Sequence, residues 1–160
     1  MATQMCIMEK GIIKQTGTPA DLYERPKSSF VAKFLGEINC LVGTVEQKIG
    51  NLVTISLGEN GKIQLLSESH ENKNTRFYVR PEKIFFDTGK EQKEPVNSLE
   101  GTLVSIDFFG SYTRYQIQLI DGTLFKLSLH HRKPKQHKHF IGDSVRVLFP
   151  ISDVFQIHEN

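Results

Sequence analysis

Three groups of side chains in this sequence have types and spacing that can do chemistry. The first is the tripeptide Arg80-Pro81-Glu82, which places a guanidinium and a carboxylate two positions apart. These charges can contact a partner domain. They can instead brace the end of a strand, because proline interrupts a strand ladder and an X-Pro step favours a rigid, extended turn. We favour the brace and keep the interface as the alternative.

The second group extends from Asp107 to Arg114 and includes Phe109, Tyr112 and Arg114. It also contains Gly110, and a glycine inside a strand pattern indicates a β-bulge that bends the strand. We favour this structural interpretation of the segment. Phe109, Tyr112 and Arg114 remain candidate regulatory or interface residues.

The third group is the run from His130 to His139, which contains four histidines and four lysine or arginine residues. Such a run can bind nucleic acid or an anionic surface. Domains that bind single strands also use aromatic side chains, and this run has none, although Phe140 borders it. Without cysteine or the spacing of a structural zinc site, a metal is not expected. A solvated loop is the preferred interpretation.

The bulk composition fits a soluble globular protein of one domain or two small ones. The chain has 160 residues, 38% of them hydrophobic and 24% charged, and a formal net charge of +2. A charge this small does not by itself indicate a nucleic-acid or membrane partner. No signal peptide and no apolar run near the ~20 residues of a membrane span are visible. Cys6 and Cys40 lie in apolar surroundings and are expected to be buried, free thiols.

The elements that position these groups begin with residues 1–37, which we call the lead segment. Its apolar residues predict a small hairpin that ends at Gly17. Thr18 and Pro19 then start one short helix, and Ser28 or Ser29 starts a second. Phe30 and Phe34 lie on one apolar face of the second helix. We expect that face to pack on the strands that follow or to dock on another domain.

Residues 38–160, which we call the β domain, alternate apolar and polar residues with the period of a strand. The strands fall into two groups, residues 39–87 and 99–158, and polar loops are expected at 67–75, 88–98 and 130–139. Both groups open with a similar phrase, Leu-Val-Gly-Thr-Val from Leu41 and Leu-Glu-Gly-Thr-Leu from Leu99. The predicted fold is therefore mainly β: an OB-like barrel or sandwich of two small β units that share a core, preceded by the hairpin and two short helices.

The residues from Met8 to Leu41 carry a specific resemblance. They read MEKGIIKQTGTPADLYERPKSSFVAKFLGEINCL, and this stretch resembles the end of the nucleotide-binding domain in the ATPase subunits of ABC importers. Val79-Arg-Pro-Glu-Lys-Ile84 looks like the Arg-Pro-Glu motif of the transport-associated OB domain (TOBE) in those subunits. The residues from Ile141 to Val147 resemble a late strand of that domain. Within the family, Gly-Glu-Ile-Asn from Gly36 looks most like the spermidine/putrescine importers.

The resemblance implies a division into residues 1–37, the tail of a nucleotide-binding domain, and residues 38–160, a regulatory TOBE domain. It implies a homodimer formed through the β domain, contacts with an ATPase domain and membrane permeases, and a place at the inner face of the cell membrane. Loops such as that around Phe109, Tyr112 and Arg114 line ligand sites in some members. Thr3-Gln4 stands where the family has Asp-Arg, so the first strand can differ.

No phosphate-binding loop of the form GxxxxGK[ST] and no Leu-Ser-Gly-Gly signature occur in the sequence. We therefore expect no hydrolysis, no catalytic residue and no cofactor in this chain; ATP and Mg²⁺ would belong to an upstream domain. Two alternatives remain: a free OB-type nucleic-acid-binding protein that uses residues 130–139, and a regulatory domain that senses a small molecule.

Overall fold

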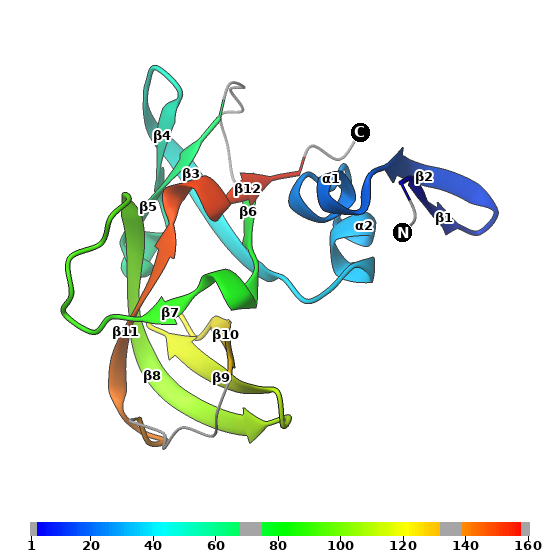
Figure 1. Ribbon diagram of the computed structural model, residues 1–160. Helices are drawn as coiled ribbons and strands as arrows, with labels where there is room; N and C mark the ends of the chain where they lie inside the picture. Colours follow the sequence, from blue (N-terminus) through cyan, green and yellow to red (C-terminus); the bar gives the residue numbers. More distant parts are fainter. Residues whose placement is uncertain (1–2, 68–74, 132–138, 158–160) are drawn as a thin grey trace.

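The computed structural model describes residues 3–67, 75–131 and 139–157 (Figure 1). The lead segment contains β1 (Met5–Glu9), β2 (Ile12–Gly17), α1 (Pro19–Glu24) and α2 (Ser29–Phe34). The β domain contains β3 (Asn39–Ile49), β4 (Leu52–Ser56), β5 (Lys62–Leu66), β6 (Thr75–Val79), β7 (Phe85–Phe86), β8 (Val96–Phe108), β9 (Tyr112–Leu119), β10 (Leu124–His130), β11 (Ser144–Pro150) and β12 (Phe155–Gln156). Short 3₁₀ turns lie at η1 (Gly58–Asn60), η2 (Pro81–Lys83) and η3 (Ile151–Asp153).

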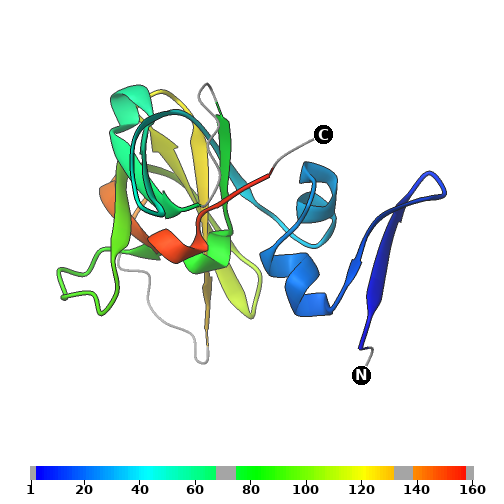
Figure 2. The same ribbon diagram turned by 90° about the horizontal axis from the view of Figure 1, so that it is seen from above.

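The lead segment has the predicted hairpin and two helices. Lys10 and Gly11 both have positive φ, +50° and +79°, which is the geometry of a tight two-residue hairpin turn. The side chain of Thr18 accepts a hydrogen bond from the N–H of Asp21 at the start of α1. Ser28 caps α2 in the same way. Both views show the hairpin farthest from the β domain, with the helices between them (Figures 1 and 2).

Several local predictions were wrong. Cys6 and Cys40 are exposed, because both lie on the outward face of their strands. Gly110, with φ of +77°, lies in the turn between β8 and β9. The bulge of β8 lies instead between Leu103 and Ser105, at least five residues before Gly110.

Two predicted loops are partly strand. Residues 96–98 of the expected loop 88–98 belong to β8, and Thr75 of the expected loop 67–75 opens β6. Both strands are longer than predicted because these residues pair with strands that are distant in the sequence. Local composition does not indicate such pairing. Most of the expected loop 130–139 lies outside the described residues; of the described part, His130 ends β10.

Two five-stranded antiparallel sheets form the β domain, in the orders β12-β6-β3-β4-β5 and β10-β9-β8-β11-β7. Each sheet is completed by a strand from the other half of the sequence. Phe85 and Phe86 of β7 pair with Leu148 and Val147 of β11. In return, β12 pairs with Tyr78 and Phe77 of β6. The two halves therefore exchange their last strands reciprocally.

The strand registers give a residue-by-residue correspondence between the halves. Asn39 faces Val79 in the first sheet, and Asn97 faces Phe149 in the second. Gly43 and Gly101 occupy corresponding positions four residues later. A Cβ on either glycine would lie 2.5 Å from its nearest neighbour, Cγ2 of Ile55 for Gly43 and the carbonyl oxygen of Gln118 for Gly101. Glycine is thus required where each first strand crosses the next.

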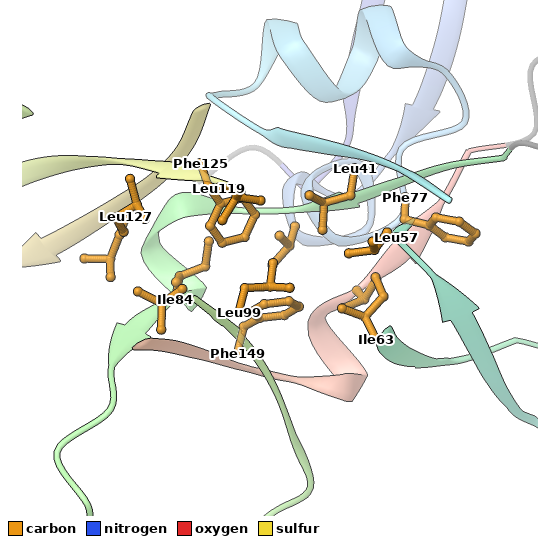
Figure 3. Close-up of a cluster of buried hydrophobic side chains, with 14 of the residues drawn as sticks. Leu41, Leu57, Ile63, Phe77, Ile84, Leu99, Leu119, Phe125, Leu127 and Phe149 are labelled. Carbon is orange, nitrogen blue, oxygen red and sulfur yellow. The ribbon is translucent and has the colours of Figure 1, made fainter. Parts of the chain in front are cut away.

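One hydrophobic core serves both halves. Leu41, Ile63 and Phe77 come from the first half, and Leu99, Phe125 and Phe149 from the second (Figure 3). These side chains belong to a single cluster of buried residues. The mainly β, OB-like fold of two small units that share a core is confirmed.

Two buried asparagines join the two sheets, because each hydrogen-bonds the backbone of a strand in the other sheet. The side chain of Asn97 accepts from the N–H of Gln64 at 2.6 Å and donates to its carbonyl at 2.8 Å. The side chain of Asn39 holds the N–H and carbonyl of Lys126 in the same way, at 2.7 and 2.8 Å. Gln64 and Lys126 lie on the edge strands β5 and β10. Each asparagine therefore bonds to an edge strand as a neighbouring strand would.

Within the described residues, no helix has the length and apolar character needed to cross a membrane.

Candidate functional site

Arg80 fastens the β domain to the lead segment. Its Nη2 donates to the carbonyl of Tyr23 at 2.9 Å. Its Nη1 donates to the carbonyls of Ala32 at 3.3 Å and Glu37 at 3.4 Å. These carbonyls lie at the end of α1, in α2 and directly before β3. One guanidinium thus ties three points of the lead segment to the exit of β6.

The Arg80 side chain is buried and leaves little for an outside partner to contact. Its exposed fraction is 3%, and its guanidinium lies over the Tyr23 ring at 3.7 Å from the ring centroid. Burial lowers the pKa of the guanidinium from its ordinary value. Arginine nevertheless stays protonated in proteins, so the charge persists and favours the three carbonyl contacts. This geometry supports a bracing role for Arg80.

The other two residues of the tripeptide belong to the same junction. Pro81 is buried and begins η2, and Glu82 accepts a hydrogen bond from the Tyr23 hydroxyl. A small apolar cluster adds to the junction: Ala32 of α2 lies among buried Tyr78 and Ile157 of the β domain. The lead segment is therefore attached by both polar and apolar contacts.

An open pocket of about 420 Å³ lies at this junction. Its lining combines three residues of the lead segment with six of the β domain: Tyr23, Gly36, Glu37, Pro81, Glu82, Tyr112, Arg114, Ser128 and His130. Pro81 and Glu82 of the first predicted group thus meet Tyr112 and Arg114 of the second. Arg80 is not in the lining, although its guanidinium stacks on the ring of Tyr23, which is.

Two cross-strand pairs form the wall of the pocket on the β domain. Arg114 of β9 lies opposite Ser128 of β10, and Tyr112 lies opposite His130. Residues two apart on a strand share a face, so the four side chains point the same way. The rings of Tyr112 and His130 are 5.5 Å apart. Strand alternation therefore produces this wall without any special backbone geometry.

Glu37 enters the pocket from the lead segment and pairs with two cations. One carboxylate oxygen lies 3.0 Å from Nη2 of Arg114, and the other lies 3.6 Å from Nζ of Lys126. The backbone of Lys126 is the segment held by Asn39, two residues after Glu37. The asparagine thus positions β10 against the start of β3, where Glu37 reaches Arg114.

Phe109 lies beside the pocket and not in its lining. Its ring stacks on Tyr112 at 4.9 Å between centroids, with an angle of 10° between the planes. The Arg114 guanidinium lies 4.9 Å from the Phe109 centroid. Phe109 and Tyr112 therefore hold the Arg114 side chain on the pocket side of β9.

Phe30 and Phe34, the predicted docking face, lie on α2 and are not among the residues that line the pocket. Their rings stack at 6.0 Å. Phe30 packs on the lead-segment cluster of Ile7, Leu22 and Val31, whereas Phe34 is 62% exposed. Phe34 thus leaves an apolar side chain at the surface of the lead segment.

The sequence did not single out Tyr23, Glu37, Ser128 or His130 as members of one site. Glu37 was noticed only as part of a family phrase, and Ser128 only as a polar residue between apolar ones. Their long separation along the chain leaves no local signal. Of the histidine run, His130 is part of the pocket, and residues 132–138 lie outside the described residues. Among the described residues no cluster of three or more His, Cys, Asp or Glu can hold a metal ion.

Comparison with known proteins identifies relatives that match most of the chain. The model of the TOBE domain family matches residues 77–156, which is half of the sequence. The spermidine/putrescine import ATP-binding protein PotA of Ruegeria pomeroyi is 31% identical over 150 residues, 94% of this chain and 40% of that protein. PotA of Thermobifida fusca is 35% identical over 127 residues, 77% of this chain and 32% of that protein. The chain therefore spans about two fifths or less of these relatives.

A solved structure shares the fold. The cytoplasmic molybdate-binding protein ModG superposes with a TM-score of 0.58 over 75% of this chain and 96% of its own. The sequence identity is 19%, so this likeness concerns the fold alone.

Proposed function

The chain belongs to the TOBE domain family, and on that premise we propose that it is the regulatory and dimerisation region of an ABC importer's ATP-binding subunit. The observation that carries this proposal is the similarity to PotA over 94% of the chain, lead segment included. A matched lead segment is expected if the chain continues a nucleotide-binding domain. By the same similarity, we infer polyamine uptake, spermidine or putrescine, as the process that the intact subunit supports.

In this proposal the chain itself catalyses no reaction. Residues 1–37 would complete a nucleotide-binding domain, and residues 38–160 would be the TOBE domain. ATP and Mg²⁺ would bind to the nucleotide-binding domain, since the sequence has no phosphate-binding loop of the P-loop form. The lead segment exposes several large apolar side chains, Met8, Ile12, Ile13 and Phe34, and these support docking of the segment on that domain. In the importer the subunit would lie on the cytoplasmic side of the membrane, against permease subunits.

Arg80 supports a mechanical role for the junction. It binds carbonyls of the lead segment at three points, Tyr23, Ala32 and Glu37. Motion of the lead segment would therefore be transmitted to the β domain as motion of one body. Two β domains paired in a dimer would act as a fixed pivot while the ATPase halves close on ATP.

A chimera tests the proposal. The matched 150 residues of Ruegeria pomeroyi PotA are replaced by this chain, and ATP hydrolysis and uptake of labelled spermidine are measured in cells that lack their own importer. We expect both activities to be retained. A matched control joins the same PotA fragment to this chain with its lead segment replaced by a flexible linker, and it should lose coupling between ATP hydrolysis and uptake. A folded chimera without either activity would contradict the proposal.

Dimerisation is tested separately on the chain as it stands. Sedimentation equilibrium over a wide range of protein concentration should show a reversible dimer. A strict monomer at the highest concentration would remove the dimerisation part of the proposal. It would leave the connection to an ATPase domain intact.

The nucleic-acid alternative makes a different prediction. Binding to phosphates releases counterions, so its affinity falls steeply with salt. We expect the chain not to bind single-stranded oligonucleotides at low salt. Measurable binding with a steep salt dependence would favour the alternative.

A further inference from the structure

Two turns from the two halves of the β domain meet at a chemically labile dipeptide, Asn60-Gly61 in the turn between β4 and β5. Among the asparagines of the sequence, Asn60 alone precedes a glycine. Asparagine is a thermolabile residue, because the backbone nitrogen of the next residue can attack its side-chain carbonyl. A following glycine favours the attack, since it has no side chain to obstruct ring closure and its backbone is unusually free.

The local structure leaves this dipeptide accessible. Gly58 and Gly61 are exposed and both have positive φ, +63° and +89°. A Cβ on Gly61 would meet no atom within 4 Å, so the space around its nitrogen is open. The turn is held by long bonds, from the N–H of Asn60 to the carbonyl of Leu57 at 3.4 Å and from the N–H of Gly61 to that of Gly58 at 3.1 Å. Exposed backbone bonds with little packing open at low cost, and one such opening frees the Gly61 nitrogen.

The side chain of Asn60 is also the contact between the two turns. Its Oδ1 accepts a hydrogen bond from the N–H of Asp121 at 3.3 Å, and Asp121 lies in the turn between β9 and β10. The Asp121 carboxylate accepts a hydrogen bond from the Asn60 amide, which is the largest cause of the lowered pKa of that carboxyl. A hydrogen bond from Thr123 acts in the same direction. One amide group therefore links turns that are 61 positions apart in the chain.

Asp121 also precedes a glycine, Gly122, and an aspartyl side chain can undergo a related ring closure. That reaction needs the protonated carboxyl, because a carboxylate is a poor target for an amide nitrogen. The hydrogen bonds that lower the pKa of Asp121 keep it ionised near neutral pH. Of the two dipeptides in contact, Asn60-Gly61 is therefore the reactive one.

We propose that Asn60 is a site of spontaneous deamidation, and that its conversion opens the contact between the two turns. The Gly61 nitrogen bonds to Cγ of Asn60, the bond from Cγ to Nδ2 breaks, and Nδ2 leaves as ammonia with the proton of the Gly61 amide. Water then opens the five-membered ring at either of its two carbonyl carbons and leaves an aspartyl or an isoaspartyl residue. This goes beyond the proposed function, because water is the only co-reactant and no ATPase partner is needed.

The consequence for the fold is local. A carboxylate at position 60 cannot donate to the Asp121 carboxylate, and the two like charges repel each other. The backbone bonds of Asn39 and Asn97 hold the sheets elsewhere and do not involve Asn60. Deamidation therefore separates the two turns and leaves the barrel assembled.

The test ages the full chain in mildly alkaline buffer, well below its unfolding temperature, and follows each asparagine by mass spectrometry of its peptides. Labelling with an isoaspartyl methyltransferase identifies the isoaspartyl product. Asn51 is the internal control, because it lies exposed in the turn between β3 and β4 but precedes Leu52. We expect Asn60 to convert several-fold faster than Asn51 and to give both products.

Two results would overturn the proposal. One is conversion of Asn51 as fast as that of Asn60. The other is an Asn60 that keeps its amide in the folded chain while it converts in urea, since the fold would then block the reaction.

Variants test the role of the contact. Asp121→Ser removes the carboxylate and keeps a hydroxyl for the turn, so the Asn60 amide is released and should convert several-fold faster. Asn60→Asp mimics one product and should quicken hydrogen exchange at Asp121 and Gly122, whereas the matched control Asn51→Asp should not. Unchanged or slower conversion in Asp121→Ser would refute control by the contact. Equal exchange in Asn60→Asp and the parent chain would refute the opening of the two turns.

Discussion

The two halves of the β domain share the residues that stabilise the barrel. They differ in the residues that contact the lead segment. Asn39 and Asn97 make the same pair of backbone bonds. At the exits of the corresponding strands, however, Arg80 in the first half stands where Pro150 stands in the second. Only the first half therefore has a guanidinium to receive the lead segment.

The residues that line the pocket also have no counterparts at the corresponding positions of the other half. Glu37 lies two residues before Asn39, whereas Pro95 lies two residues before Asn97. Arg114 and Ser128 form a polar pair on β9 and β10. The register places Leu52 and Leu66 as the corresponding pair on β4 and β5. The comparison teaches that the repeated residues maintain the barrel, while the unrepeated ones, Arg80, Glu37 and Arg114, form the junction.

The largest expected effect tests the repeated asparagines. Asn39→Ala and Asn97→Ala each leave a backbone N–H and a carbonyl of an edge strand without partners, at a cost of about 3 kcal/mol in the free energy of unfolding. Urea denaturation followed by circular dichroism measures this cost. If the halves are mechanically equivalent, the two losses agree within error. A large difference between the two losses would show that the two asparagines do not play equivalent roles.

The repeated glycines come next. Gly43→Ala and Gly101→Ala place a Cβ within 2.5 Å of neighbouring atoms, and relief of that overlap should cost about 2 kcal/mol. Gly17→Ala is the matched control, because its Cβ would meet its nearest neighbour at an ordinary 3.7 Å. Thermal unfolding of the three variants checks the order. A control as destabilised as the other two would refute the steric explanation.

The unrepeated arginine should act locally. Arg80→Met keeps the stem in place and removes the donors to three carbonyls, so we expect about 1.5 kcal/mol of destabilisation. Hydrogen exchange should quicken in α1 and α2 and stay unchanged in β8 to β11. Uniform acceleration over both halves would show that Arg80 supports the whole barrel and not the junction.

The smallest effect concerns an ion pair between corresponding residues. Lys83 and Asp153 occupy equivalent positions in η2 and η3, and their charged groups lie 3.2 Å apart. A partly exposed pair contributes less than about 1 kcal/mol. A double-mutant cycle with Lys83→Ala and Asp153→Ala measures this coupling, and exchange of the two residues should restore it. A coupling free energy well above that limit would contradict the expectation that this partly exposed ion pair contributes little to stability.

Much of the fold could be predicted from the sequence. The alternation of Val53, Ile55 and Leu57 indicates a strand because successive side chains point to opposite faces. Thr18 and Ser28 mark helix starts because their hydroxyls accept otherwise unpaired backbone N–H groups. The similar phrases at Leu41 and Leu99 indicate two units with a shared core. The resemblance to the ATPase subunits of ABC importers was also visible at this level, from Met8 to Leu41, and the similarity to PotA agrees with it.

The exchange of last strands could not be predicted in the same way. The strands β7 and β12 have two residues each, too few for a periodic signal. Their pairing is decided by what lies beside them when both halves pack into one core. The roles of Asn39 and Asn97 were hidden for the same reason, since each bonds to a strand 87 or 33 residues distant.

By itself the sequence determined which segments are strands and helices and which residues carry charge, because periodicity and side-chain chemistry are local properties. Only the tertiary structure decided that Arg80 faces inward and that Arg114 meets Glu37. It also decided that Tyr23 and His130 line one pocket, although 107 positions separate them in the chain. The reason is that a site between segments exists only after the shared core has fixed their relative places.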